Sequence, residues 1–161
     1  MDEEKRFELL AGCVQLDVSA RDREDAIRKA CGPLISGGFV QERYPEDVIA
    51  REKLWATGLP TMPVGVAIPH ALEPKNVVEA QIAACRLTEA VKFAQSGGTE
   101  QDEEIDVRLV FVLALKDPKA QLHLLQKLMV AISDEEMLAA LLDAKTPSDF
   151  SNIFNGGTSA G

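Results

Sequence analysis

Apolar and polar positions follow two different periods along this chain, and the period predicts the type of each element. Val14, Leu16 and Val18 alternate with polar neighbours, as in a half-buried strand. Residues 107–115 form a nearly continuous apolar run, which is typical of a central strand covered on both faces. Residues 22–35 instead carry apolar side chains at helical spacing, as a helix packed on a sheet would.

Capping and turn residues predict the limits of the remaining elements. Ser19 is a suitable N-cap for the helix that runs to Ile35, and Gly37-Gly38 would stop it. Tyr44-Pro45 would start a second helix, ending near Thr57-Gly58, because proline is tolerated in a first turn. The further elements expected are a strand at 66–68, strands at 79–87 and 91–93, a loop at 95–106, and helices at 119–132, 134–143 and 147–154.

These elements predict one α/β domain, with a mixed central sheet flanked by helices on both faces. The segment 79–87 could be helix or strand by its period, and a strand is preferred because the sheet needs a partner there. A chain of 161 residues suits a single domain with a real core. The domain is expected over residues 1–155, with 156–161 as a disordered tail.

Composition excludes several classes of function. With 46% hydrophobic and 27% charged residues, the chain has the composition of a soluble globular protein. A net charge of −9 argues against nucleic-acid binding and is compatible with a partner that has a basic docking face. No apolar run approaches the roughly 18 residues of a membrane span, and no signal-like segment opens the chain, so a cytoplasmic protein without membrane insertion is expected. Three widely spaced cysteines, Cys13, Cys31 and Cys85, suggest neither a disulfide framework nor a zinc site.

His70 is the strongest candidate for chemistry. Pro69 cannot donate to a strand ladder, so the short strand ends there and His70 lies at the carboxyl edge of the sheet, where α/β sites are usually built. A neutral imidazole is a good nucleophile toward phosphorus, and a phosphoryl group on it needs cationic donors nearby. Arg51 is the best donor candidate in the preceding helix. It could equally be a solvated residue that pairs with Glu46 or Asp47.

The second histidine has a weaker case. At 100° per residue, His123 shares a polar helical stripe with Lys119 and Gln126, so it is expected on the surface. Gln121 is expected toward the buried side of the same helix, as a polar residue among core positions. The buried stripe is predicted to contain Leu125, Leu128, Met129 and Ile132.

Other chemistries find little support. There is no phosphate-cradling loop and no Gly-x-Ser-x-Gly motif, and two separated histidines without clustered acids make a metal site improbable. Cysteine catalysis is disfavoured because Cys13 and Cys85 lie in apolar strand contexts, where a thiol is ordinarily inert.

Three motifs together resemble a known family. Arg51-Glu52-Lys53-Leu54, then Thr57-Gly58, then Val66-Ala67-Ile68-Pro69-His70 is similar to the enzyme IIA domain of the bacterial sugar phosphotransferase system, in its fructose/mannitol class. The Thr-Gly-Leu-Pro loop and the Gly-Val-Ala-Ile-Pro-His segment look most like the galactitol-type branch. The similarity continues, in order, through residues 91–93, 106–115, 121–132 and 134–136.

The resemblance implies a phosphocarrier for sugar or polyol uptake. His70 would accept a phosphoryl group from phospho-HPr and pass it to a cysteine of an EIIB component, which works with a membrane EIIC component, and no cofactor or metal would be needed. Arg51 matches the family's active-site arginine. Gln121 takes the place of the family's second histidine and is left as a hydrogen-bond donor to the phosphate. The chain departs from the family pattern in this glutamine, in Ala71 after the histidine, and in a longer segment between Arg51 and His70.

Two alternatives remain open. In the first, the same domain is a nitrogen-type regulatory module, and phosphorylation of His70 switches its binding to a protein target. In the second, which ranks last, His70 is a general base of an enzyme. The phosphocarrier reading further predicts an apolar docking patch around His70, made of Leu59, Met62, Val64 and Leu72.

Overall fold

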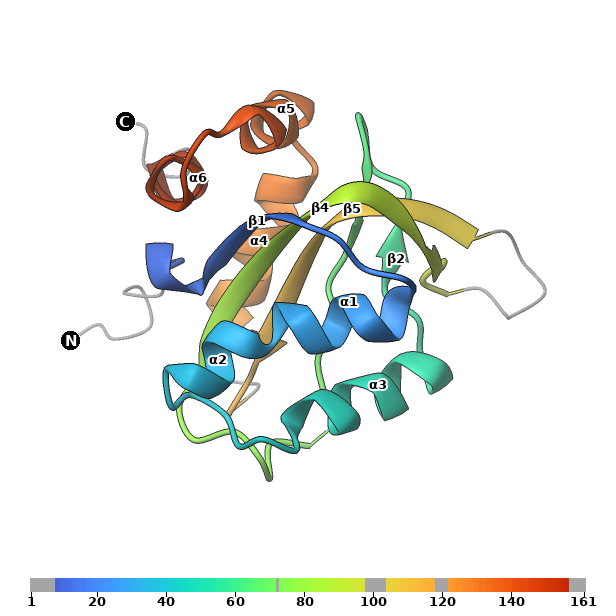
Figure 1. Cartoon of the computed structure of the whole chain (residues 1–161), viewed down its shortest axis with the longest axis vertical. Coiled ribbons are helices and arrows are strands. Elements are labelled where there is room, and N and C mark those ends of the chain that lie inside the picture. The colour runs from blue at the N-terminus through green and yellow to red at the C-terminus, as the bar shows by residue number, and fades with distance from the viewer. Residues whose placement is uncertain (1–7, 72, 98–103, 118–121, 157–161) are drawn as a thin grey trace.

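The computed structural model describes residues 8–71, 73–97, 104–117 and 122–156 (Figure 1). A five-stranded mixed sheet runs through the molecule in the order β1-β4-β5-β3-β2. Parallel pairs join β1 to β4 and β3 to β5, whereas β4 with β5 and β2 with β3 are antiparallel. The strands are β1 (Val14–Val18), β2 (Gly58–Leu59), β3 (Gly65–Ala67), β4 (Gln81–Ala94) and β5 (Glu104–Ala114).

Helices cover both faces of the sheet. On one face lie α1 (Arg23–Ala30), α2 (Gly32–Ser36) and α3 (Tyr44–Leu54), and α1 packs on β4 and β5. The other face carries α4 (Leu122–Ile132), α5 (Glu135–Asp143) and α6 (Pro147–Gly156). There the ring of Phe111 on β5 packs against Phe150 and Phe154 of α6, with centroids 6.4 and 5.7 Å apart. The predicted α/β class and the mixed sheet between two helical layers are confirmed.

The central strand is the one that the apolar run predicts. β5 is third in the sheet, and its residues from Leu109 to Ala114 are all buried. Side chains of successive residues point to opposite faces, so a strand covered on both sides must be apolar at every position. A 3-10 turn (Ala11–Cys13) precedes β1, and the three cysteines are buried and free.

The predicted helix over 22–35 is two helices. Its N-cap is Asp22, whose Oδ1 accepts from the N–H of Asp25 at 2.8 Å, and not Ser19. The chain changes direction at Cys31-Gly32, where α1 ends and α2 begins. Pro33 has no N–H to bond to the preceding turn, so a proline at this point divides the helix.

The two strands predicted at 79–87 and 91–93 are a single strand. β4 pairs with β5 along its whole length, with an irregularity between Arg86 and Val91. Thr88, Glu89 and Ala90 are exposed there, which interrupts the alternation that sequence reasoning relies on. The partner strand β5 also begins at Glu104, inside the predicted 95–106 loop.

α4 and α5 end where predicted, at Ile132 and Asp143, whereas α6 extends two residues beyond its predicted end at Phe154. Asp134 caps α5 by accepting from the N–H groups of Glu136 and Met137. α6 includes Gly156, the first residue of the predicted disordered tail, and the side-chain amide of Asn155 beside it exchanges two hydrogen bonds of 2.9 Å with the backbone of Leu9. Of the predicted tail, residues 157–161 lie outside the described ranges.

Candidate functional site

A pocket of about 390 Å³ opens at the carboxyl edge of β3, and both His70 and Arg51 line it. Three segments build it: the end of α3 with the residues that follow, the exit of β3, and the turn after β4. The other lining residues are Leu54, Trp55, Ala56, Thr57, Ile68, Ser96 and Gly97. The two residues that sequence reasoning selected from different elements therefore meet in one place.

The backbone around His70 is held from two sides. The N–H of Leu113 on β5 donates to the carbonyl of Pro69 at 3.1 Å. Tyr44, on α3, is fully buried, and its hydroxyl donates to the carbonyl of Leu113 and accepts from the N–H of Ala71 at 3.3 Å. β3 ends at Ala67, one residue before the predicted end at Ile68, and His70 rejoins the sheet through an isolated parallel bridge to Leu113 of β5.

The imidazole of His70 is held in one tautomer. Its Nδ1 lies 3.0 Å from the carbonyl oxygen of Ile68, and because a carbonyl only accepts, Nδ1 carries the proton. The lone pair of the neutral ring is then on Nε2. Burial lowers the pKa of His70 below 6.5, and the positive charge of Arg51 lowers it further, against the hydrogen bond to Ile68. The ring is therefore neutral and nucleophilic at pH 7.

Arg51 rests against the aromatic ring at the mouth of the pocket. Its Nη1 donates to the carbonyl of Trp55 at 3.2 Å, and its Cζ lies 5.7 Å from the Trp55 ring centroid. Within the described residues the Trp55 carbonyl is the one hydrogen-bond acceptor of the Arg51 guanidinium, so its other N–H groups can donate to an anion in the pocket.

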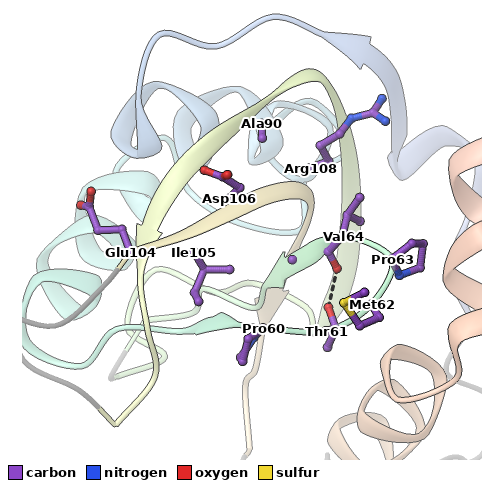
Figure 2. A pocket seen from close by; sticks show the side chains of 11 residues that line it. Pro60, Thr61, Met62, Pro63, Val64, Ala90, Glu104, Ile105, Asp106 and Arg108 are labelled. Carbon is purple, nitrogen blue, oxygen red and sulfur yellow. Dashed lines mark hydrogen bonds between the residues drawn. The ribbon is translucent and has the colours of Figure 1, made fainter.

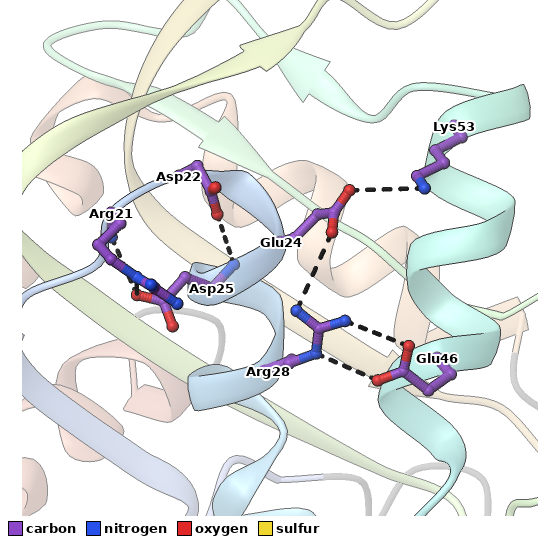
Figure 3. A network of polar contacts seen from close by, with 7 residues as sticks. All are labelled: Arg21, Asp22, Glu24, Asp25, Arg28, Glu46 and Lys53. Atoms are coloured by element: carbon purple, nitrogen blue, oxygen red, sulfur yellow. Dashed lines mark hydrogen bonds and ion pairs between the residues drawn. The ribbon is translucent and has the colours of Figure 1, made fainter.

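Neither Glu46 nor Asp47, the two acids considered as surface partners, forms an ion pair with Arg51. Glu46 pairs instead with Arg28 of α1, at 3.1 Å, and Lys53 pairs with Glu24 at 3.5 Å (Figure 3). Asp47 accepts from the side chain of Asn76. The alternative pairing of Arg51 with Glu46 or Asp47 is therefore wrong.

Sequence reasoning missed Glu52 and Thr57. Glu52 is 6% exposed and accepts from both the N–H and the hydroxyl of Thr57, each at 2.9 Å. The signal was available, because Tyr44, Val48 and Glu52 are spaced four apart and all lie on the buried stripe of α3. The same bonds explain why α3 ends at Leu54, short of the predicted Thr57-Gly58: Thr57 is turned back toward Glu52.

The predicted apolar patch is differently composed. Met62 and Val64 line a separate cavity of about 340 Å³, together with Pro60, Ile105 and Arg108 (Figure 2). Leu59 does not line the His70 pocket, and Leu72 lies outside the described ranges. The exposed apolar side chains beside His70 are Leu54 and Trp55, which are 69% and 52% exposed.

The other two candidate residues are Gln121 and His123, and His123 does not line the His70 pocket. Gln121 is outside the described ranges, so its predicted place toward the buried side is untested. His123 is exposed on α4, as predicted. The buried stripe of α4 contains Leu124, which was not predicted, and lacks Met129, which was predicted to be buried but is 42% exposed.

Burial also disfavours thiol chemistry at Cys31 and Cys85. Burial raises the pKa of Cys31 and Cys85 to about 12, so neither is a thiolate at neutral pH. Within residues 8–71, 73–97, 104–117 and 122–156 there is no His, Cys, Asp or Glu cluster for a metal, and no helix long and apolar enough to cross a membrane.

The chain and its fold have counterparts in one family. The family model "Phosphoenolpyruvate-dependent sugar phosphotransferase system, EIIA 2" matches residues 9–156. The chain belongs to this family, whose members are phosphotransferase components. The resemblance noted in the sequence is thereby confirmed.

Two relatives illustrate the breadth of the family. The chain is 28% identical over 129 residues to the galactitol-specific EIIA component of Escherichia coli (strain K12), covering 80% of this chain and 83% of the relative. It is also 28% identical over 144 residues to the mannitol-specific phosphotransferase enzyme IIA component of Bacillus subtilis (strain 168), covering 88% and 92%.

Two solved structures share the fold. One is the complex of enzyme IIAMtl and phosphorylated enzyme IIBMtl from Escherichia coli, with a TM-score of 0.74, 26% identity, and coverage of 93% of this chain and 99% of that one. The other is the nitrogen regulatory protein IIA-Ntr from Neisseria meningitidis, with a TM-score of 0.72, 25% identity, and coverage of 91% and 95%.

Proposed function

We propose that this protein is a phosphocarrier in which Nε2 of His70 accepts a phosphoryl group and passes it on. The observation that carries the proposal is the hydrogen bond between Nδ1 of His70 and the Ile68 carbonyl. It leaves a lone pair on Nε2, in a ring whose pKa is lowered by burial, next to a guanidinium in the same pocket. A nucleophile and a cation at one site are what transfer of a dianionic group requires.

Transfer proceeds by in-line displacement at phosphorus. Nε2 forms a bond to the phosphorus of the donor phosphohistidine while the bond from phosphorus to the donor nitrogen breaks, and that electron pair returns to the donor ring. Arg51 neutralises the equatorial oxygens, and Gln121 is proposed as an additional hydrogen-bond donor. The second transfer repeats the exchange, with a cysteine thiolate of the acceptor as the nucleophile. The nitrogen–phosphorus bond is already energetic, so positioning is sufficient and no cofactor takes part.

The proposed partners are phospho-HPr as donor and an EIIB component, working with a membrane EIIC component, as acceptor. Exposed Leu54 and Trp55 beside the pocket suit a protein surface that docks over His70. The IIAMtl complex with phosphorylated IIBMtl supports an acceptor of this kind. We place the protein in the cytoplasm, where these partners act.

The transported sugar is proposed to be a polyol of the galactitol or mannitol type. The galactitol and mannitol relatives named above are each 28% identical to this chain, so they support the polyol class and do not distinguish galactitol from mannitol. Transfer from the phosphorylated protein to purified galactitol-type and mannitol-type EIIB distinguishes them.

The direct test is phosphotransfer from phosphoenolpyruvate through enzyme I and HPr, followed by intact mass. Wild type is expected to gain one acid-labile phosphoryl group. His70→Ala should gain none, and the matched variant His123→Ala, which removes the exposed second histidine, should behave as wild type. Absence of an adduct on wild type, with HPr itself phosphorylated, would refute the phosphocarrier.

Arg51 is tested in the same assay. Removing one preorganised donor to a developing anion commonly costs about 10²–10³ in rate. Arg51→Gln should therefore slow phosphoryl acceptance by about 10²-fold, with Arg51→Lys intermediate. Equal rates in wild type and Arg51→Gln would remove Arg51 from the transfer step.

A regulatory module is the second candidate, favoured by the match to the nitrogen regulatory protein IIA-Ntr. In that role His70 is phosphorylated as above, but no EIIB accepts the group. A phosphorylated protein that stays loaded with every EIIB offered, and binds a protein target in only one state, would establish this reading.

A further inference from the structure

A buried carboxylate lies directly behind the His70 pocket. Glu52 and Thr57 are 6% and 5% exposed. Both protons that Thr57 can donate go to this carboxylate: the backbone N lies 2.9 Å from Oε2, and Oγ1 lies 2.9 Å from Oε1. One side chain therefore fixes the backbone and the rotamer of Thr57 together.

Thr57 passes this constraint to the end of β3. Its hydroxyl oxygen accepts from the N–H of Ile68, with the two atoms 3.3 Å apart. The carbonyl oxygen of the same Ile68 lies 3.0 Å from Nδ1 of His70. A continuous chain of hydrogen bonds thus leads from Glu52, through Thr57 and Ile68, to the imidazole.

The carboxylate is a costly way to close a turn. Glu52 lies in the last turn of α3, where the negative end of the helix dipole disfavours an acid. Burial raises its pKa, against the hydrogen bonds from Thr57. Apolar side chains of similar size would close the same turn without burying a charge. The bonds that Glu52 accepts therefore point to a role beyond stability.

We propose that Glu52 and Thr57 are positioning residues, which fix Ile68 so that His70 keeps its proton on Nδ1 and its lone pair on Nε2. The effect is geometric, because the Ile68 carbonyl belongs to the peptide bond with Pro69, which has no N–H to relay polarisation. The consequence for phosphoryl transfer rests on the proposed function of His70. The consequence for the tautomer does not.

The test is the tautomer ratio of His70, measured by nitrogen-15 NMR at a pH where the ring is neutral. Thr57→Val keeps the shape of the side chain and removes both hydroxyl bonds. The ratio of Nδ1–H to Nε2–H is expected to fall about fivefold, the equilibrium equivalent of one typical net hydrogen bond. Thr57→Ser, which restores the hydroxyl, should restore the ratio.

Tyr44→Phe is the matched control. It also removes one buried hydroxyl that holds the His70 segment, but that hydroxyl binds Ala71, which follows His70 in the chain, and within the described residues it forms no hydrogen bond to Ile68 or to the imidazole. The variant should lose stability and keep the wild-type tautomer ratio. If Thr57→Val also keeps the ratio while losing stability, Glu52 and Thr57 do no more than close the turn after α3, and the proposal is overturned.

Two additional measurements keep the test decisive. Glu52→Gln, whose amide nitrogen cannot accept the Thr57 hydroxyl proton, should shift the ratio in the same direction and replaces Thr57→Val if that variant does not fold. In phosphotransfer, Thr57→Val should lower the rate at saturating phospho-HPr about tenfold with KM unchanged. If Thr57→Val shifts the tautomer ratio but the wild-type protein accepts no phosphoryl group, the proposed function is refuted and the positioning role of Glu52 and Thr57 is supported.

Discussion

The carbonyl oxygen of Ile68 lies 3.0 Å from Nδ1 of His70, two residues further along the chain. This short-range contact determines which ring nitrogen is available for chemistry. It depends on long-range order, because the N–H of Ile68 is held by Thr57 and the carbonyl of Pro69 by Leu113 of β5. The reactivity of one side chain is therefore a property of how α3 and β5 meet.

The ionisation of His70 gives the first prediction. Burial and the charge of Arg51 lower its pKa below 6.5, so Arg51→Gln should raise it, though not to 6.5, because burial remains. NMR titration of the His70 ring, assigned with a His123→Gln variant, measures the shift. A pKa that falls or stays constant in Arg51→Gln would contradict the assignment of Arg51 to this pocket.

The same pKa fixes the pH dependence. Between the folded pKa and 6.5 the unfolded chain binds a proton at His70 that the folded protein does not, so the free energy of unfolding rises with pH across that window. The loss of unfolding free energy that comes from protonating His70 is complete below the folded pKa and absent above 6.5. Phosphoryl acceptance should decline as pH falls through the folded pKa, because Nε2 then carries a proton. A rate unchanged to well below that pKa would argue against Nε2 as the nucleophile.

Trp55 should report the state of the site. It is the one tryptophan in the sequence, and the Arg51 guanidinium lies 5.7 Å from its ring centroid. A phosphoryl group on His70 would draw Arg51 toward it and change the ring's surroundings, so phosphorylation should change tryptophan emission reversibly. The change should disappear in Arg51→Gln. An identical change in that variant would show that Arg51 does not move.

Arg86 is expected to be a stability residue with no role in transfer. Its side chain is 7% exposed, and Nη1 donates at 2.9 Å to the carbonyls of Leu141, Leu142 and Ala144 at the end of α5. Arg86→Met removes the donor that these three buried carbonyls share and should cost about 3 kcal/mol in urea unfolding. The matched variant Arg108→Met, which loses one bond to Leu87, should cost about 1 kcal/mol or less. Equal losses would contradict this account.

Gly58 is required by close approach. A Cβ there would lie 2.6 Å from the carbonyl oxygen of Ala94, a backbone atom that cannot easily move. The N–H of Ser96 donates to the carbonyl of Gly58 at 2.8 Å, which brings the turn after β4 to the His70 pocket. Gly58→Ala should therefore cost about 1–3 kcal/mol and slow phosphoryl acceptance.

Gly32→Ala is the matched control, because it makes the same glycine-to-alanine change in the unfolded chain at a position where the folded protein has room for a Cβ. A Cβ at Gly32 would meet nothing within 4 Å, and the residue lies in α2, so alanine should be neutral or stabilising by up to about 1 kcal/mol. Equal effects of the two substitutions would show that crowding at Gly58 is not the cause.

The sequence by itself determined the features that depend on local period and local chemistry. The apolar run at 107–115 predicted the central strand, and Tyr44-Pro45 predicted the start of α3. The strand predicted at 66–68 exists as β3, one residue earlier in the chain, at Gly65–Ala67. The motif around Arg51 and His70 was enough to recognise the family. These signals are short, and each depends on which residues can adopt a given backbone conformation.

Only the tertiary structure decided what depends on contacts between distant segments. β4 remains one strand through exposed Thr88, Glu89 and Ala90 because β5 pairs with it on both sides of the irregularity. Arg51 lines the His70 pocket because folding brings the end of α3 beside the exit of β3, and Glu46 pairs with Arg28 from another helix. The buried Glu52 has no local signature beyond its spacing, since a carboxylate becomes useful in a core only when folding brings its donors to it.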